Sequence, residues 1–296
     1  MQTLPAFLPP TAALLREPVS IGLLQTLQRD PVAVPFLPQP AETAWTFAAG
    51  SDDPPILLLH GFDSSALEFR FVLPRLGQRH PTWAVDLWGF GFTGRQSGAA
   101  YGRAEIQTHL HAFWQAHIQR PVLVVGASMG GAAAVDFAVN HPQAVQKLVL
   151  IASTGFTGPP AWLGGLAEPL REAAVEYFRQ RRLVALGWSE LVGDRNTAEL
   201  IRCAALPMEM PHWREAMLDF NARGGYRILE EQIRAVTQPT LILWGEKDDS
   251  IPPADALKFL AAIDNSALIW IGGCGHVPQI ERPGVTAGYI LRFALA

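Results

Sequence analysis

The chain has 296 residues, 49% hydrophobic and 17% charged, a composition that predicts a folded protein with a large buried core rather than a disordered one. Its formal net charge is −4, and no block of Lys or Arg is longer than Arg181-Arg182, which excludes a nucleic-acid-binding footprint. Two cysteines, Cys203 and Cys274, are too few and too far apart to suggest a disulfide framework, and no metal-ligand spacing includes them.

Residues 1–40 form a segment rich in Pro and Leu, and we expect them to be an arm ahead of the main fold. Residues 12–27 can form a short amphipathic helix whose apolar positions are Leu14, Leu15, Ile21, Leu24 and Leu27. Such a helix either packs on the body of the protein or anchors it to a membrane surface. The segment lacks the pattern of a signal peptide, and no apolar run in the chain has the length of a membrane span. These features predict a protein that is cytoplasmic or peripherally bound to a membrane.

Short apolar runs that read as strands alternate with helical patterns. We predict strands at residues 44–48, 56–59, 82–85, 122–125, 148–151, 240–244 and 267–271. We predict helices at residues 103–118, 129–140, 254–263 and 285–295. Most of the strand runs are continuously apolar, as is typical of parallel strands covered on both faces. The alternation predicts an α/β fold with a doubly wound, mostly parallel sheet, built from residues 41–153 and 237–296.

The interval 154–236 breaks this alternation, because it contains no convincing strand. Helical patterns dominate it, for example at residues 170–184 and 196–205. Strands resume at Thr240, so we interpret the interval as a helical lid (cap) inserted into the core rather than as a separate domain.

Ser128 occupies the best position in the chain for a nucleophile. It lies in Gly126-Ala127-Ser128-Met129-Gly130, directly after one predicted strand and directly before a predicted helix. The small residues around it allow strand and helix to approach closely, while the hydroxyl points out of a strained turn. The surrounding strand, turn and helix make this G-x-S-x-G more specific than the bare motif.

An acid and a histidine follow two later strands, in the order Ser, Asp, His. Asp248 lies in the loop after the Thr240 strand, and His276 lies in the loop after the strand at 267–271. Because ligands bind outside the carboxyl ends of parallel strands, these loops should meet Ser128. His276 is then the base that takes the serine proton, and Asp248 orients its imidazole. Asp249 is a competing acid, and we favour Asp248 by its spacing from the flanking turn residues.

The loop after the strand at 56–59 predicts an oxyanion hole. Gly61 lets the backbone turn so that the N–H of Phe62 faces the serine, and the N–H of Met129 supplies a second donor. We expect His60 to brace this loop rather than to react. We expect Cys274 to be a small packed residue, and Asp136 to lie too far along its helix to reach His276.

The chain resembles the α/β-hydrolase superfamily over about residues 41–296. The stretches that carry the resemblance are LLHGF at 58–62, DLWGFG at 86–91, GASMGG at 126–131, GEKDDSIP at 245–252 and GHVPQIERP at 275–283. The resemblance implies the same fold and the triad roles of Ser128, Asp248 and His276.

Three stretches resemble a narrower family, the chlorophyll dephytylases of oxygenic phototrophs. They are PILLLHGFDSSALEFR at 55–70, TWAVD at 82–86 and VDFAVN at 135–140. This resemblance implies hydrolysis of the phytyl ester of chlorophyll to chlorophyllide and phytol, in contact with photosynthetic membranes.

A phytyl tail is a long apolar chain, and burying each methylene is worth about 0.8 kcal/mol. The predicted lid carries apolar residues that either line a groove for such a chain or pack the lid onto the sheet: Phe156, Trp162, Leu163, Leu166, Leu170, Tyr177, Phe178, Trp188 and Trp213. We predict that Phe62, Trp162 and Leu163 contact the substrate.

The sequence therefore predicts a serine ester hydrolase that acts on a bulky apolar ester, with chlorophyll favoured, and that needs no metal or organic cofactor. One alternative is a generic carboxylesterase or lipase. Another is a pigment- or lipid-binding carrier that keeps the fold without turnover. Dehalogenase and epoxide hydrolase chemistry is disfavoured, because enzymes of those kinds resemble this fold but place an aspartate where Ser128 stands.

Overall fold

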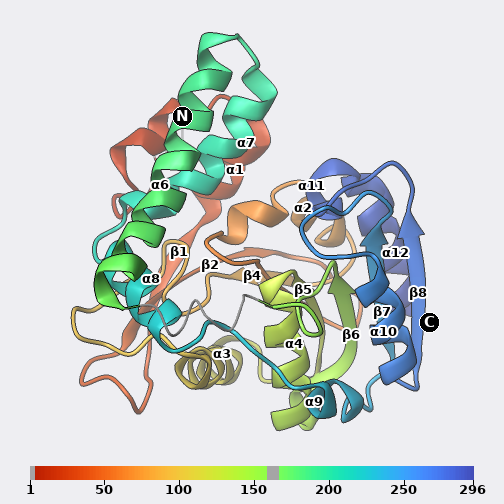
Figure 1. Ribbon diagram of the computed structural model, residues 1–296. Helices are drawn as coiled ribbons and strands as arrows, with labels where there is room; N and C mark the ends of the chain where they lie inside the picture. The colour runs from red at the N-terminus through yellow and green to blue at the C-terminus, as the bar shows by residue number, and fades with distance from the viewer. Residues whose placement is uncertain (1–3, 159–166) are drawn as a thin grey trace.

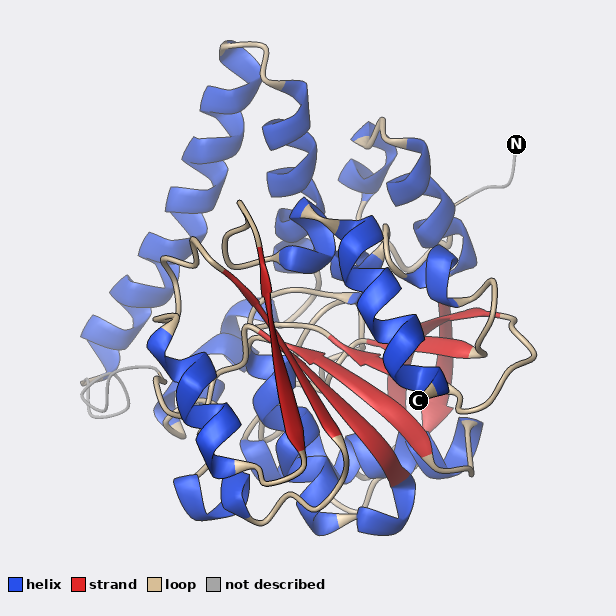
Figure 2. Cartoon of the chain, turned by 90° about the vertical axis from the view of Figure 1, so that its right-hand side faces the viewer, coloured by secondary structure: helices blue, strands red, loops and turns tan. Residues whose placement is uncertain are grey.

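The computed structural model describes residues 4–158 and 167–296, which build a sandwich of helices around a central sheet (Figures 1 and 2). The strands are β1 (Gln28–Val32), β2 (Ala41–Ala48), β3 (Ile56–Leu59), β4 (Thr82–Val85), β5 (Val122–Ala127), β6 (Val145–Ile151), β7 (Thr240–Gly245) and β8 (Ser266–Ile271). They lie in the order β1-β2-β4-β3-β5-β6-β7-β8. Only the pairs β1/β2 and β2/β4 are antiparallel. The predicted doubly wound, mostly parallel sheet is confirmed.

The continuous apolar strands arise because the sheet is buried on both faces. Leu57 and Leu59 of β3 belong to one buried cluster, and Ile56 and Leu58 belong to the cluster on the opposite face. The first cluster is completed by α3 (Arg103–His117), α4 (Met129–Asn140) and α10 (Ala254–Ala262). The second is completed by the N-terminal arm, α2 (Leu73–Leu76) and α12 (Pro283–Leu295).

Strand β1 is the one that the sequence reading omits. Its residues run Gln28-Arg29-Asp30-Pro31-Val32, which has neither apolar continuity nor clean alternation. It lies at the edge of the sheet, where a proline is tolerated because one side of the strand needs no N–H donors. Pairing with β2 stabilises a segment whose own composition does not favour a strand.

The single helix expected at 12–27 is wrong. The arm contains a 3₁₀ helix, η1 (Pro10–Leu14), and a separate helix, α1 (Pro18–Thr26). Pro18 causes the break, since it opens α1 and holds Glu17 in an extended conformation. Leu15, Leu24 and Leu27 are buried in the second cluster, so the arm packs on the body of the protein.

The chain between β6 and β7 carries α6 (Glu168–Leu191), α7 (Arg195–Ala205), the 3₁₀ helix η4 (Leu206–Glu209), α8 (Trp213–Ala222) and α9 (Glu230–Arg234). We call α6–α9 the inserted helices, because β6 and β7 are neighbours in the sheet. Figure 1 shows α6 and α7 rising together with the N-terminal arm beyond the edge of the sheet. No described helix, α6 included, has both the length and the hydropathy to cross a bilayer. The division into arm, core and lid stays a prediction.

The switch point of the sheet lies between β3 and β5. From β3 the chain pairs with β4 on one side and then crosses to β5 on the other. The loops that leave the carboxyl ends of these two strands therefore diverge, and the space between them is where open α/β sheets hold their ligands.

Candidate active site

Ser128 forms a strained elbow between β5 and α4. Its backbone has φ 52° and ψ −119°, a conformation that residues other than glycine rarely adopt and that is found at functional sites. Only small neighbours permit the turn. A Cβ on Gly126 would lie 2.2 Å from the carbonyl oxygen of Gly130, and one on Gly130 would lie 2.1 Å from that of Leu59. The glycines predicted from the motif are thus required by backbone contact.

Ser128, His276 and Asp248 form a continuous hydrogen-bonded chain. The Nε2 of His276 lies 3.1 Å from the Oγ of Ser128. The Nδ1 of the same ring lies 3.0 Å and 3.1 Å from the two carboxylate oxygens of Asp248. The two late loops are also joined directly, because the N–H of Lys247 donates to the carbonyl oxygen of Cys274 at 2.8 Å. The sequence-predicted side chains are therefore brought together at one rim of the sheet.

The Asp248 carboxylate is fully buried and held ionised. Burial alone would raise its pKa, but hydrogen bonds from His276 and from the N–H groups of Ile251 and Ser250 outweigh it and lower the pKa. The competing Asp249 is exposed and accepts only from the hydroxyl of Ser250 among the described residues. Its carboxylate makes no contact with His276.

The loop after β3 lies against the elbow. Leu59 pairs with Gly126, so Gly61 emerges beside the serine, and a Cβ on Gly61 would lie 3.3 Å from the Cβ of Ser128. Within the described part of the chain, the N–H groups of Phe62 and Met129 have no hydrogen-bond acceptor. Two free donors beside a serine hydroxyl are what an oxyanion hole requires.

The buried acid Glu68 braces this loop, and the sequence did not predict a role for it. Glu68 accepts the N–H of Gly61 at 2.9 Å and the amide of Gln279 at 2.7 Å. Burial raises the pKa of Glu68, although the hydrogen bonds from Gly61, Ser64 and Gln279 act in the opposite direction. Glu68 thus ties the loop after β3 to the segment that follows His276.

The backbone on either side of His276 is held by a second acid. Glu281 accepts the N–H groups of Gly275 and Val277 at 2.8 Å and 3.2 Å. Glu68 and Glu281 both lie in stretches that carried the family resemblance, and this was the available signal for them.

Asp63, next to Phe62, connects the same loop to the inserted helices. Its carboxylate accepts the indole N–H of Trp213 at 2.9 Å and a guanidinium N–H of Arg182 at 2.8 Å. Burial raises the pKa of Asp63, while Arg182 and Trp213 favour its ionised form. The ring of Phe62 stacks on Phe220 of α8, with centroids 5.6 Å apart.

His60 is fully buried and makes two backbone hydrogen bonds. Its Nδ1 lies 2.8 Å from the carbonyl oxygen of Gly61, and its Nε2 accepts the N–H of Leu87 at 3.1 Å. Burial lowers the pKa of His60 to about 4, so the ring is neutral at neutral pH and can serve as both donor and acceptor. These contacts are those of a brace.

The other groups that the sequence singled out lie apart from this chemistry. Cys274 is buried, and burial raises the pKa of its thiol to about 12. Asp136 binds Arg103 through both carboxylate oxygens at 2.7 Å and accepts the hydroxyl of Tyr226 at 2.9 Å. It anchors the end of the inserted helices and makes no contact with His276.

The structure describes only some of the residues that were predicted to contact the substrate or to line a groove. Trp162, Leu163 and Leu166 lie outside the described residues. The ring of Phe62 is about half exposed at the site. Leu170, Tyr177, Phe178 and Trp188 are each more than half exposed, so they neither pack α6 on the sheet nor line an enclosed groove in the described structure.

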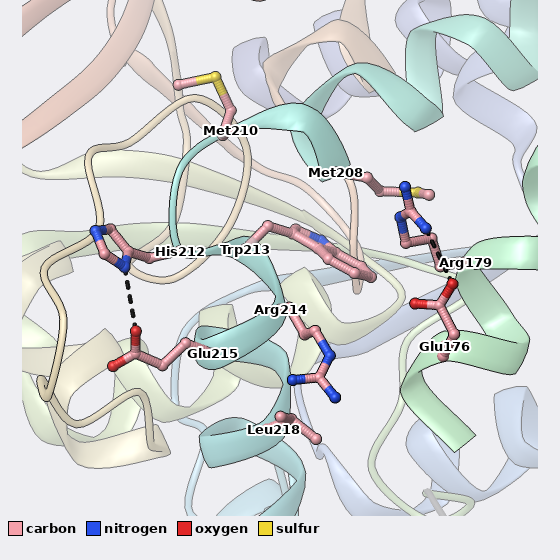
Figure 3. Close-up of a pocket in the computed structure, with 9 residues that line it drawn as sticks. All are labelled: Glu176, Arg179, Met208, Met210, His212, Trp213, Arg214, Glu215 and Leu218. Carbon is pink, nitrogen blue, oxygen red and sulfur yellow. Dashed lines mark hydrogen bonds and ion pairs between the residues drawn. The ribbon is translucent and has the colours of Figure 1, made fainter. Parts of the chain in front are cut away.

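A pocket of about 570 Å³ opens between α6 and the η4–α8 segment (Figure 3). Trp213 forms part of its wall, Glu176 pairs with Arg179 in its lining, and the Nδ1 of His212 lies 3.1 Å from the carboxylate of Glu215. Ser128, His276 and Asp248 do not line this pocket. Among the described residues, no group of three His, Cys, Asp or Glu side chains could hold a metal ion. The loops around Ser128 are therefore the better candidate site.

Comparison with known proteins agrees with this architecture. The family model for the alpha/beta hydrolase fold matches residues 54–283. The alpha/beta hydrolase domain-containing protein VTE7 of Arabidopsis thaliana is 30% identical, over 98% of this chain and 90% of its own length. Lipase 1 of Psychrobacter immobilis is 28% identical, over 79% of this chain and 74% of its own. The crystal structure of a serine hydrolase involved in carbazole degradation matches with a TM-score of 0.70 and 27% identity, covering 90% of this chain and 98% of that one.

Proposed function

The chain belongs to the alpha/beta hydrolase fold family, and on that premise we propose that it is a serine ester hydrolase with Ser128, His276 and Asp248 as its catalytic triad. The observation that carries the proposal is the hydrogen-bonded chain from the Oγ of Ser128 through His276 to Asp248, with distances of 3.1 Å and 3.0 Å.

The geometry supports a two-step acyl transfer. The Oγ of Ser128 attacks the ester carbonyl while the Nε2 of His276 takes its proton. The N–H groups of Phe62 and Met129 donate to the oxyanion that forms, and Asp248 stabilises the imidazolium. His276 then protonates the departing alcohol, which leaves an acyl-serine. A water molecule, deprotonated by the same imidazole, attacks the acyl group and releases the acid and the free serine.

The surroundings of the oxyanion loop favour an apolar, uncharged substrate. The ring of Phe62 is 47% exposed and continues into buried aromatic packing with Phe90 and Phe220. The arginine that reaches this loop, Arg182, is already paired with Asp63 and so is not free to bind a substrate carboxylate. We also propose Trp162 and Leu163 as substrate contacts.

We propose the phytyl ester of chlorophyll as the substrate, which would bring the enzyme to a photosynthetic membrane. The sequence likeness to dephytylases at residues 55–70, 82–86 and 135–140 supports this assignment. The relative from a plant, matched over nearly the whole chain, is consistent with it. The likeness to a bacterial lipase supports a second candidate, a carboxylesterase or lipase acting on other apolar esters.

Two assays test these proposals. Wild-type enzyme should label with a fluorophosphonate probe, whereas Ser128→Ala should not. Label that does not depend on Ser128, or no label at all, would favour a non-catalytic carrier. Hydrolysis of chlorophyll a to chlorophyllide and phytol should then be compared with hydrolysis of short p-nitrophenyl esters. Rapid turnover of the short esters with chlorophyll left intact would reject chlorophyll and retain the esterase.

A further inference from the structure

Helix α6 presents a row of apolar side chains to solvent. We define the α6 stripe as Leu170, Tyr177, Val184, Trp188 and Leu191, whose spacings of 7, 7, 4 and 3 residues place them on one helix face. They are between 59% and 78% exposed. At about 1.5 Å per residue the stripe extends for about 32 Å along the helix. An exposed apolar surface of this length in one row is characteristic of an interaction site.

Packing within the chain does not account for the stripe. Helix α6 contacts α7 and α8, and its buried residues are Val175 and Ser189. Arg182, which binds Asp63 of the oxyanion loop, also points away from the stripe by its helical position. The stripe faces away from these contacts, and the ring contact of Tyr177 with Phe178 lies within the same helix.

Unpaired cations accompany the stripe. Arg181 lies on the same face, four residues after Tyr177, and is exposed without an ion-pair partner in the described chain. Arg16 and Arg195 flank the C-terminal end of α6, where they line one small pocket, and neither forms an ion pair with a described residue.

The acids at this end of α6 are Glu190, Asp194 and Glu199. Glu190 pairs with Arg202, and Glu199 accepts the backbone N–H groups of Arg16 and Glu17. Asp194 and Glu199 form no ion pair with a described residue either, so this end of α6 carries unpaired charge of both signs. On the face that carries the stripe, the charged side chain of α6 is Arg181, and no acid of the helix lies there.

We propose that the α6 stripe is a docking surface for an anionic lipid bilayer. Helix α6 would lie in the plane of the interface, with Tyr177 and Trp188 at headgroup depth and Arg181 near a lipid phosphate. The inference is drawn from the surface alone and does not rest on the proposed substrate.

The charge pattern disfavours a second copy of the chain as the occupant. In a symmetric, antiparallel pairing of two stripes the twofold axis passes near the middle of the row, between Tyr177 and Val184. Arg181 would then meet its own copy, with like charges brought together in an apolar contact. A bilayer with anionic headgroups instead gives each arginine an opposite charge.

Flotation with lipid vesicles tests the proposal on the full chain. Wild-type protein should float with vesicles of phosphatidylcholine and phosphatidylglycerol, and less with phosphatidylcholine alone. The double variant Trp188→Gln/Leu191→Gln should lose binding by at least about tenfold. Arg181→Gln should lose about fivefold on the anionic vesicles only. Leu257→Gln is the matched control, because Leu257 is 55% exposed but lies on α10, and it should bind as wild type.

Two outcomes would overturn the proposal. One is equal flotation of the double variant and the wild type. The other is a wild-type dimer in light scattering that the double variant dissociates, with no flotation of either, which would make the stripe a subunit interface. Turnover of a soluble p-nitrophenyl ester, measured in parallel, should be unchanged in every variant. Turnover of the soluble ester shows that each variant is folded. It also distinguishes a failure of the proposed esterase activity from a failure of membrane docking.

Discussion

Asp63 offers the sharpest test of how the inserted helices act on the candidate active site. Its carboxylate accepts hydrogen bonds from Arg182 of α6 and Trp213 of α8, and the next residue back, Phe62, carries a proposed oxyanion donor. Asp63→Asn keeps the size of the side chain, and Asn tolerates the left-handed backbone of this position, φ 49°. The variant therefore removes the charge without straining the turn.

The expected effect is on kcat rather than on KM. Loss of one oxyanion donor costs about 100- to 1,000-fold in rate. Displacement of Phe62, rather than its loss, should cost part of that, and we expect about 10- to 100-fold. The asparagine also leaves Arg182 without its counter-charge in a half-buried position, so the free energy of unfolding should fall by about 1–3 kcal/mol.

Asp136→Asn is the matched control. Asp136 is also a buried acid that ties the inserted helices to the core, through Arg103 and Tyr226, but it does not border the oxyanion loop. Both variants should be destabilised by similar amounts, and only Asp63→Asn should lose kcat. Trp213→Phe, which removes one donor to Asp63 and keeps a ring, should show an intermediate loss.

The assay compares turnover of a p-nitrophenyl ester with inhibition by a trifluoromethyl ketone, which forms a tetrahedral oxyanion on the serine. The inhibition constant for Asp63→Asn should rise in proportion to the fall in kcat/KM, because both report binding of the oxyanion. An equal loss of kcat in Asp63→Asn and Asp136→Asn would refute the reasoning, as would a lower kcat with an unchanged inhibition constant.

Three further predictions address the loops and the core. Glu281→Ala should lower kcat about tenfold by loosening the backbone around His276, with little change in melting temperature; an unchanged rate would exclude a positioning role. Gly130→Ala should destabilise the fold by about 3 kcal/mol in denaturant titration, because its Cβ would lie 2.1 Å from the carbonyl oxygen of Leu59; a stability equal to wild type would contradict that contact. Burial lowers the pKa of His109 to about 3. Between pH 6.5 and about pH 5 this histidine therefore binds a proton in the unfolded chain but not in the folded chain, and the free energy of unfolding should fall by about 2 kcal/mol. A His109→Gln variant whose stability shows the same pH dependence would contradict this prediction.

The sequence predicts the strands that are buried on both faces, because their residues form short apolar runs. The runs at 56–59 and 82–85 coincide with β3 and β4, because strands buried on both faces are almost wholly apolar; the exception, Thr82, donates its hydroxyl to the carbonyl oxygen of His80. Strand β1 carries no such signal, since its stability comes from pairing with β2. The helix expected at 170–184 is Glu168–Leu191, because nothing beyond Val184 stops it: Gly187 has open space around it and the helix runs on almost to Gly193.

The chemistry at the candidate site was predictable for a related reason. Ser128 directly follows β5, and Asp248 and His276 lie in the loops after β7 and β8. The topology of a parallel sheet therefore carries all three to the same rim without knowledge of side-chain contacts. The residues that support the site are not marked by a strand end in this way. Glu68 and Gln279 are 211 positions apart, and their hydrogen bond depends on how two loops fold over each other. Only coordinates or a resemblance can identify such pairs.

The contacts that hold the loop after β3 connect it to different parts of the molecule. His60 fixes the loop to the residues after β4 through Leu87. Glu68 fixes it to the segment after His276 through Gln279. Asp63 and the stacked ring of Phe62 tie it to the inserted helices.

A movement of α6 and α8 can therefore reach the proposed oxyanion donors through Asp63 and the stacked ring of Phe62, while the contacts of His60 and Glu68 keep the loop on the core. Preorganised donors stabilise a transition state because they need no rearrangement when charge develops. If α6 docks on a bilayer, the same helix that meets the lipid holds Arg182 against Asp63, so docking acts beside the proposed oxyanion hole and not at the proposed triad.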